Sequence, residues 1–187
     1  GSASIVATSA LLGGGLWNYS CAYAASQNYT ASTAVNSWMY VTQVTPTIPI
    51  ASLTAVNYGT STQTGCARTA GDSTSTLTLY RNSSNVASGT TTPQNETSIV
   101  LGAAVYNYSC AISATQNYTA NSNLSQYRTV NPVASTVTIS LTNNNTAYGT
   151  TQSASCNITT GDSTATLTLY RNGSSVSSGS GNRSESI

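Results

Sequence analysis

The strongest constraint on this chain is an internal repeat of about 90 residues. The motif Asn-Tyr-Ser-Cys ends at Cys21 and again at Cys110, 89 positions later. A second set of motifs is offset by 90 positions and includes Leu-Thr-Leu-Tyr-Arg-Asn, which begins at Leu77 and at Leu167. Several motifs in register over nearly the whole chain indicate tandem copies of one structural unit rather than low-complexity sequence.

The residue pattern of the repeat predicts a series of short β-strands. Leu77 and Leu79 alternate with threonines, and such period-2 alternation places apolar side chains on one face of a strand. Turn-forming pairs such as Gly71-Asp72 and Asn172-Gly173 separate the apolar runs. The predicted fold class is therefore all-β, with about seven short strands in each repeat, which is typical of a β-sandwich.

The composition argues against catalysis. Only 5% of the residues are charged, and the chain has neither histidine nor lysine, so Ser-His, Cys-His and Ser-Lys pairs cannot form. The five arginines are dispersed, whereas nucleic-acid binding needs clustered cations. We expect no enzyme activity, no cofactor, no metal and no nucleic-acid partner. Asp72 and Asp162 are interpreted as turn residues that bond to their own backbone.

The water-facing side is rich in Ser, Thr and Asn and carries many N-glycosylation sequons. Sugar would then replace charge as the solubilising layer, with covalent glycans as partners. The eleven candidate asparagines are Asn18, Asn28, Asn82, Asn95, Asn107, Asn117, Asn123, Asn144, Asn157, Asn172 and Asn182.

Four cysteines at repeat-equivalent positions indicate an oxidising compartment. We therefore expect an extracellular, cell-surface location. No stretch of 18 or more apolar residues occurs, so we expect no membrane span in this chain.

Cysteine and tyrosine spacing carries a family resemblance. Cys66 and Cys110 are 44 positions apart, Tyr108 lies two residues before Cys110, and Tyr19 lies two before Cys21. The repeat resembles the Thr/Ser/Asn-rich immunoglobulin-like repeats of microbial, particularly archaeal, surface and filament proteins. The resemblance implies an inter-sheet disulfide between Cys66 and Cys110, and a tyrosine corner at Tyr19 and Tyr108. Leucines stand where an antibody domain has its third-strand Trp, which argues against a true antibody-type domain.

Domain boundaries are predicted at Pro46 and Pro132. Residues 46–131 would form one complete immunoglobulin-like sandwich. Residues 1–45 would hold the last strands of a second sandwich, and residues 132–187 its first strands. Each half carries one cysteine without a partner, Cys21 or Cys156.

Three arrangements of the split sandwich are open. The halves could meet between neighbouring subunits head-to-tail, which would give a homopolymer linked by Cys21–Cys156. They could instead meet within one chain, or the chain could be a window of a longer repeat protein. The first arrangement predicts a structural subunit of an extracellular filament or pilus, built by strand complementation. The alternative function is an adhesin or surface-layer module that binds a glycan or another cell surface.

Overall fold

The structure is a computed structural model that describes residues 4–6, 10–122 and 125–187. Within these residues the chain forms β-strands and no helix, so the all-β prediction is confirmed. The described part accordingly contains no helix long and apolar enough to cross a membrane. Contacts divide the chain into a first unit, residues 1–131, and a second unit, residues 132–187, and each is described by itself.

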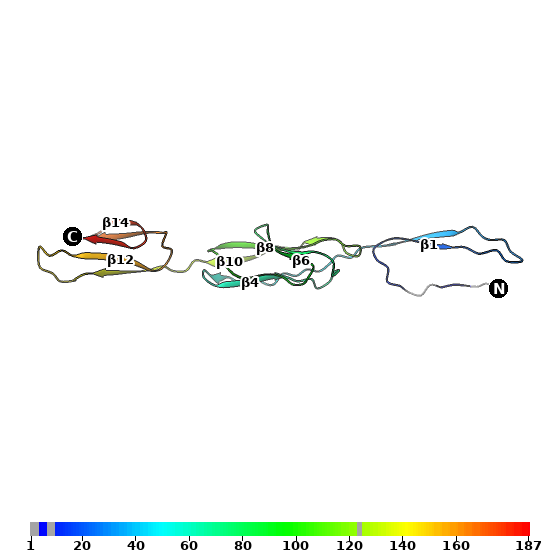
Figure 1. The fold of residues 1–187 in the computed structure, drawn as a ribbon, viewed down its shortest axis with the longest axis horizontal. Coiled ribbons are helices and arrows are strands. Elements are labelled where there is room, and N and C mark those ends of the chain that lie inside the picture. Colours follow the sequence, from blue (N-terminus) through cyan, green and yellow to red (C-terminus); the bar gives the residue numbers. More distant parts are fainter. Residues whose placement is uncertain (1–3, 7–9, 123–124) are drawn as a thin grey trace. The chain divides into compact units, whose positions relative to one another are not determined.

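The first unit begins with an antiparallel hairpin (Figure 1). Its strands are β1 (Gly15–Cys21) and β2 (Val35–Val41), paired from Gly15 with Val41 to Cys21 with Val35. Backbone hydrogen bonds just after β2 join the hairpin to the rest of the unit. The Val44 amide donates to the Asn117 carbonyl at 2.9 Å, and the Thr119 amide donates back to Val44 at 3.0 Å.

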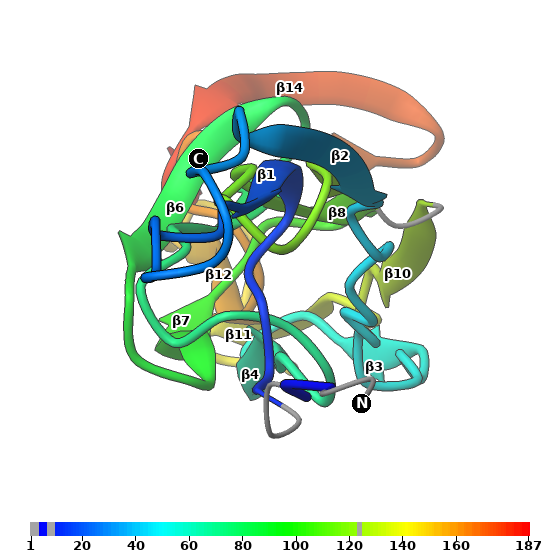
Figure 2. The ribbon, with the colours of Figure 1, turned by 90° about the vertical axis from the view of Figure 1, so that its right-hand side faces the viewer.

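Two sheets follow in the first unit. The larger has the spatial order β3 (Val56–Asn57), β10 (Gln126–Asn131), β8 (Ala104–Ile112), β5 (Leu77–Arg81) and β6 (Ser84–Gly89), with β9 (Asn121–Ser122) also paired to β8. The smaller consists of β4 (Ser61–Cys66) and β7 (Gln94–Val100). Figures 1 and 2 both show β4 on the opposite side of this region from β6 and β8.

The core of the first unit lies between these sheets. The disulfide between Cys66 on β4 and Cys110 on β8 joins them directly. Leu77 and Leu79 are fully buried beside it, as their alternation with threonine predicts. Tyr108 and Ile112 on β8, together with Ile48, complete the buried cluster.

The second unit contains two smaller sheets. One has the order β11 (Thr136–Leu141), β12 (Ser153–Thr160) and β15 (Arg183–Ser186), and the other pairs β13 (Thr166–Arg171) with β14 (Ser174–Ser180). Only Cys156 and Leu169 are buried apolar residues among its described positions.

Corresponding hairpins of the two units have the same local geometry. β5–β6 and β13–β14 each carry a register shift, after Leu79 and after Leu169. Each closes through a two-residue turn that begins with an asparagine at positive φ, 47° at Asn82 and 51° at Asn172. This backbone matches the right-handed twist of paired strands and is favoured by asparagine and glycine. The repeat in the sequence is therefore also a repeat in backbone structure.

Candidate assembly surfaces

The strand pairings show which residues of β1, β2 and β11 correspond to which residues of the sheets in residues 46–131. β1 pairs with β2 as β8 pairs with β10: Trp17 stands opposite Met39, and Tyr106 stands opposite Arg128. β11 meets β12 at Ile139 and Cys156, just as Ile50 meets Cys66. Each of these residues of β1, β2 and β11 therefore has a counterpart in residues 46–131.

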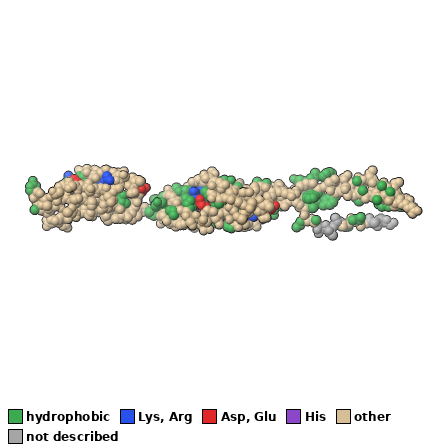
Figure 3. Space-filling model, in the orientation of Figure 1, with side chains coloured by type: hydrophobic (Ala, Val, Ile, Leu, Met, Phe, Trp, Pro, Cys, Tyr) green, Lys and Arg blue, Asp and Glu red, His purple; other side chains and the backbone are tan. Residues whose placement is uncertain are grey.

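Residues of the β1–β2 hairpin are exposed at positions whose counterparts in β8 and β10 are buried. Tyr108 is fully buried, whereas 49% of the corresponding Tyr19 is exposed. Arg128 is 6% exposed and its counterpart Met39 is 41% exposed. Figure 3 shows hydrophobic side chains gathered at the surface over this hairpin. Within the described chain, β1 has only β2 beside it, whereas β8 also pairs with β5.

The second unit is bare on the matching face. Val137 and Ile139 of β11 are 54% and 64% exposed. Their counterparts Ile48 and Ile50 belong to the core of the first unit, where Ile48 is only 4% exposed. In that core, Ile48 shares a cluster with Tyr108, Cys110 and Ile112, all from β8. The second unit thus lacks the cover that β8 provides in the first.

Both remaining cysteines carry free thiols on these faces. Cys21, at the end of β1, is exposed, and Cys156, in the middle of β12, is buried. Their counterparts Cys110 and Cys66 are the disulfide-bonded pair. The two thiols are therefore repeat equivalents of the two halves of a disulfide.

A charged cluster marks the same place in each unit. In the first unit Arg81 forms an ion pair with Glu96, and the Tyr108 hydroxyl donates to Oε2 of Glu96 at 2.8 Å. Burial, followed by the bond to the Glu96 carboxylate, raises the pKa of Tyr108 above its usual value. In the second unit Arg171 and Glu185 pair at 3.1 Å.

That second pair has no tyrosine in its own unit to complete it. The tyrosines of residues 132–187 are Tyr148 and Tyr170, which are 107% and 62% exposed. The sequence offered a signal for both ion pairs, because Arg and Glu recur at matching positions of the repeat. The contact between them could be found only from the paired strands.

The tyrosine corner differs from the sequence prediction, which placed it at Tyr19 and Tyr108. The bond from an aromatic side chain to a backbone carbonyl four residues upstream is made by Tyr106, whose hydroxyl donates to Gly102 at 3.0 Å. Trp17 makes the corresponding bond in the hairpin, from Nε1 to the Gly13 carbonyl at 2.9 Å. Tyr108 lies two residues further along β8, on the same face as Tyr106, and its hydroxyl bonds to Glu96 instead of to upstream backbone.

The two aspartates act as turn residues. Asp72 Oδ1 accepts hydrogen bonds from the Thr74 amide at 3.1 Å and the Thr74 hydroxyl at 3.0 Å. Asp162 Oδ1 makes the same two bonds to Thr164, at 2.9 and 2.8 Å. These bonds, the backbone one foremost, lower the pKa of both carboxyl groups.

The sequons are unequally accessible. Asn107 and Asn157 are partly buried, and Asn123 lies outside the described residues. Asn107 Oδ1 is enclosed without a hydrogen-bond partner, and its backbone amide donates to Asn82 Oδ1. The exposed candidates are Asn18, Asn28, Asn82, Asn95, Asn117, Asn144, Asn172 and Asn182.

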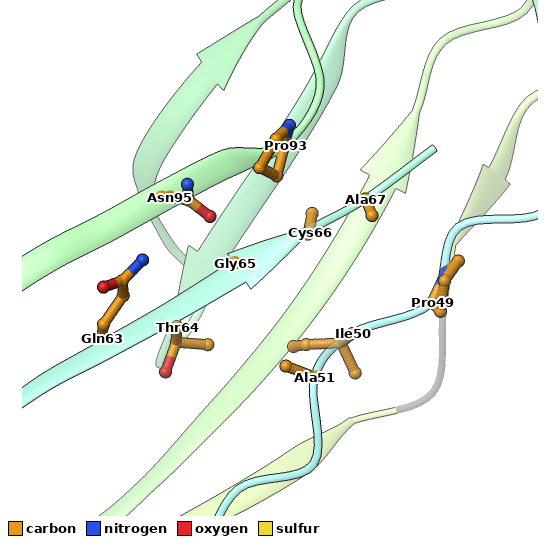
Figure 4. Close-up of a pocket in the computed structure, with 10 residues that line it drawn as sticks. All are labelled: Pro49, Ile50, Ala51, Gln63, Thr64, Gly65, Cys66, Ala67, Pro93 and Asn95. Atoms are coloured by element: carbon orange, nitrogen blue, oxygen red, sulfur yellow. The ribbon is translucent and has the colours of Figure 1, made fainter. Parts of the chain in front are cut away.

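A hollow lies beside β4. Residues of β4, β7 and the segment 49–51 line it (Figure 4). None of its ten lining residues is Asp, Glu, Arg or Tyr, and the sulfur of the one cysteine, Cys66, is held in the disulfide. The described residues also contain no group of three or more His, Cys, Asp or Glu side chains placed to hold a metal ion.

No protein-family model and no curated protein sequence matches this chain.

Proposed function

We propose that this chain is a structural subunit of an extracellular filament, assembled head-to-tail by strand complementation between copies. The N-terminal hairpin of one copy covers the second unit of the next and completes an immunoglobulin-like sandwich. One observation carries the proposal: Val137 and Ile139 are bare, whereas β8 covers their counterparts in the first unit. The hairpin of residues 15–41 is the repeat equivalent of that cover.

Association of this kind continues from copy to copy. A contact between two different surfaces of one chain propagates as an open filament when it does not close a ring. A free strand edge beside a bare apolar face favours addition of a strand from another molecule. One chain carries both surfaces, the hairpin N-terminal to residues 46–131 and the second unit C-terminal to them, so each copy can contact two neighbours.

A disulfide between Cys21 of one copy and Cys156 of the next would make the filament covalent. Two thiols form one disulfide and release two protons and two electrons. An external disulfide accepts them by thiol–disulfide exchange and becomes two thiols. The surrounding strands would enclose the new bond as β4 and β8 enclose Cys66–Cys110.

Non-reducing electrophoresis together with negative-stain electron microscopy tests the proposal. Oxidised protein should give a ladder in steps of 19.1 kDa and fibres that grow with protein concentration. Peptide mapping should find Cys21 joined to Cys156, and Cys21→Ser should abolish the ladder. A Cys21–Cys156 link within monomers, at all concentrations and without fibres, would contradict the proposal and favour a permuted domain in one chain.

An adhesin is the second candidate, and the outer face of the hairpin favours it. Trp38 is 62% exposed, and its counterpart on β10, Tyr127, is 61% exposed although the sheet around it is complete. Complementation would thus leave Trp38 at the surface, where aromatic rings can stack on sugars. Glycan-array binding that disappears with Trp38→Ala, in protein that stays monodisperse, would establish this function instead.

A further inference from the structure

The strand pairing within residues 46–131 indicates where β1 and β2 of another copy would pair with the second unit. β5 pairs with β8 on one side and β6 on the other, whereas β13 pairs only with β14 within the described residues. The free edge of β13 therefore corresponds to the edge of β5 that β8 occupies. In the intact pairing Leu79 stands opposite Cys110, and Arg81 stands opposite Tyr108.

The geometry points to a single register for the contact between copies, an inference that rests on the proposed function. We infer that β1 of one copy pairs antiparallel with β13 of another, Cys21 opposite Leu169 and Tyr19 opposite Arg171. Two side-chain pairs select this register, Tyr19 with Glu185 and Met39 with Ala154. Both follow from contacts that the first unit makes.

The first pair completes a polar cluster. Glu96 pairs with Arg81 and accepts the Tyr108 hydroxyl, and Glu185 already pairs with Arg171. Tyr19 is the counterpart of Tyr108 and is half exposed in its own chain. Seated in the inferred register, its hydroxyl donates to the Glu185 carboxylate. The bond is charge-assisted and shielded from water, so it is stronger than a bond between neutral groups.

The second pair replaces a polar contact by an apolar one. Arg128 on β10 is buried and its Nη2 donates to Thr64 Oγ1 and to the Gln63 carbonyl, both at 2.9 Å. The counterpart of Arg128 is Met39, and the counterpart of Thr64 is Ala154, which pairs with Glu185 as Thr64 pairs with Glu96.

At the counterpart positions, both residues of the Arg128–Thr64 contact are therefore replaced. A methionine against an alanine buries apolar surface on each side, whereas an arginine there would lose its hydroxyl partner. The joint change matches the N-terminal hairpin to the second unit. It also disfavours β8–β10 of a neighbouring copy as the cover, because Arg128 would then face Ala154.

A transplanted pair tests the register. Met39→Arg should raise the protein concentration needed for assembly under reducing conditions roughly tenfold or more. Adding Ala154→Thr to the same chain recreates the Arg128–Thr64 pairing and should recover most of that loss. Met39 is 41% exposed in its own chain, so the circular dichroism and unfolding midpoint of the unassembled variant should match those of the parent.

The polar pair has its own test. Tyr19→Phe should raise the assembly concentration roughly ten- to hundredfold. Glu185→Gln should act on the same bond, so the double variant should be little worse than either single one. Tyr29→Phe, which changes a 71% exposed tyrosine of the same hairpin region, is the matched control and should assemble like the parent.

Introduced cysteines read the register directly in chains that carry Cys21→Ser and Cys156→Ser. Ser20→Cys with Tyr170→Cys, placed directly opposite, should cross-link between copies; Ser20→Cys with Thr168→Cys, two residues out of register, should not. Fibres with a Cys21–Cys156 link, but with no effect of Met39→Arg or Tyr19→Phe, would overturn the register and leave the proposed function intact. Absence of fibres and of intermolecular links from the parent chain would overturn both.

Discussion

The hydroxyl of Tyr108 donates a 2.8 Å hydrogen bond to Oε2 of Glu96, whose other carboxylate oxygen pairs with Arg81. The bond joins β8 of the larger sheet to β7 of the smaller one. It therefore ties the two sheets at a second point besides the Cys66–Cys110 disulfide. A polar bond across a core must be fully satisfied to be stabilising, and here each side chain has a partner.

We expect Tyr108→Phe to lower the free energy of unfolding of the first unit by about 1.5–3 kcal/mol. The variant removes a donor to a charged acceptor and leaves one carboxylate oxygen of Glu96 without its partner. Urea unfolding of the reduced and oxidised chain would measure the change. Tyr127→Phe, at a 61% exposed position, is the control and should change stability by less than about 0.5 kcal/mol.

Alkaline pH should unfold the protein in part through the same residue. Burial and the Glu96 carboxylate raise the folded-state pKa of Tyr108 above the unfolded value of about 10. The folded state then holds the proton more tightly, so this contribution is complete below pH 10 and is lost as pH rises through the folded pKa. The stability difference between parent and Tyr108→Phe should therefore shrink above pH 10. A difference that stays constant to pH 12 would contradict this assignment.

Loss of the Cys66–Cys110 disulfide should cost more than any single hydrogen bond. The bond closes a loop with a sequence separation of 44 residues, for which chain entropy gives about 4 kcal/mol. We expect the Cys66→Ser, Cys110→Ser double variant to lose about that much stability in guanidinium unfolding. Cys21→Ser in unassembled protein should leave the midpoint of the first unit unchanged, because that thiol is exposed and unbonded.

Glycan occupancy should follow exposure in the folded chain. Asn107 has its side-chain oxygen enclosed and its backbone amide bonded to Asn82 Oδ1, so a glycan attached there would have to displace packed neighbours. Peptide mapping of protein from a glycosylating host should find Asn107 unmodified and the exposed Asn28 and Asn144 occupied. Full occupancy at Asn107 in folded, disulfide-bonded protein would show that this strand is accessible.

Local features of the sequence were enough to predict the elements. The alternation at Leu77 and Leu79 predicts a strand with one buried face, and both leucines are fully buried. Asn172-Gly173 predicts a tight turn, and both residues have positive φ between paired strands. These features are readable because a period of two and a turn residue act over a few neighbouring positions. Because the sequence repeats, a prediction made for one copy of the repeat also applies to the other copy.

The sequence by itself determined the repeat, the strands and turns within it, and the correspondence between Cys21 and Cys110 and between Cys156 and Cys66. Only the tertiary structure decided that Tyr106 rather than Tyr108 makes the bond to upstream backbone, and that Arg128 is bonded to Thr64. Only it decided that Ile48 is covered while Val137 is bare. The physical reason is that the burial of a side chain depends on which strands, distant in the sequence, pack against its face. The residue pattern of a strand predicts which of its faces is apolar, but it does not specify the strand that packs against that face.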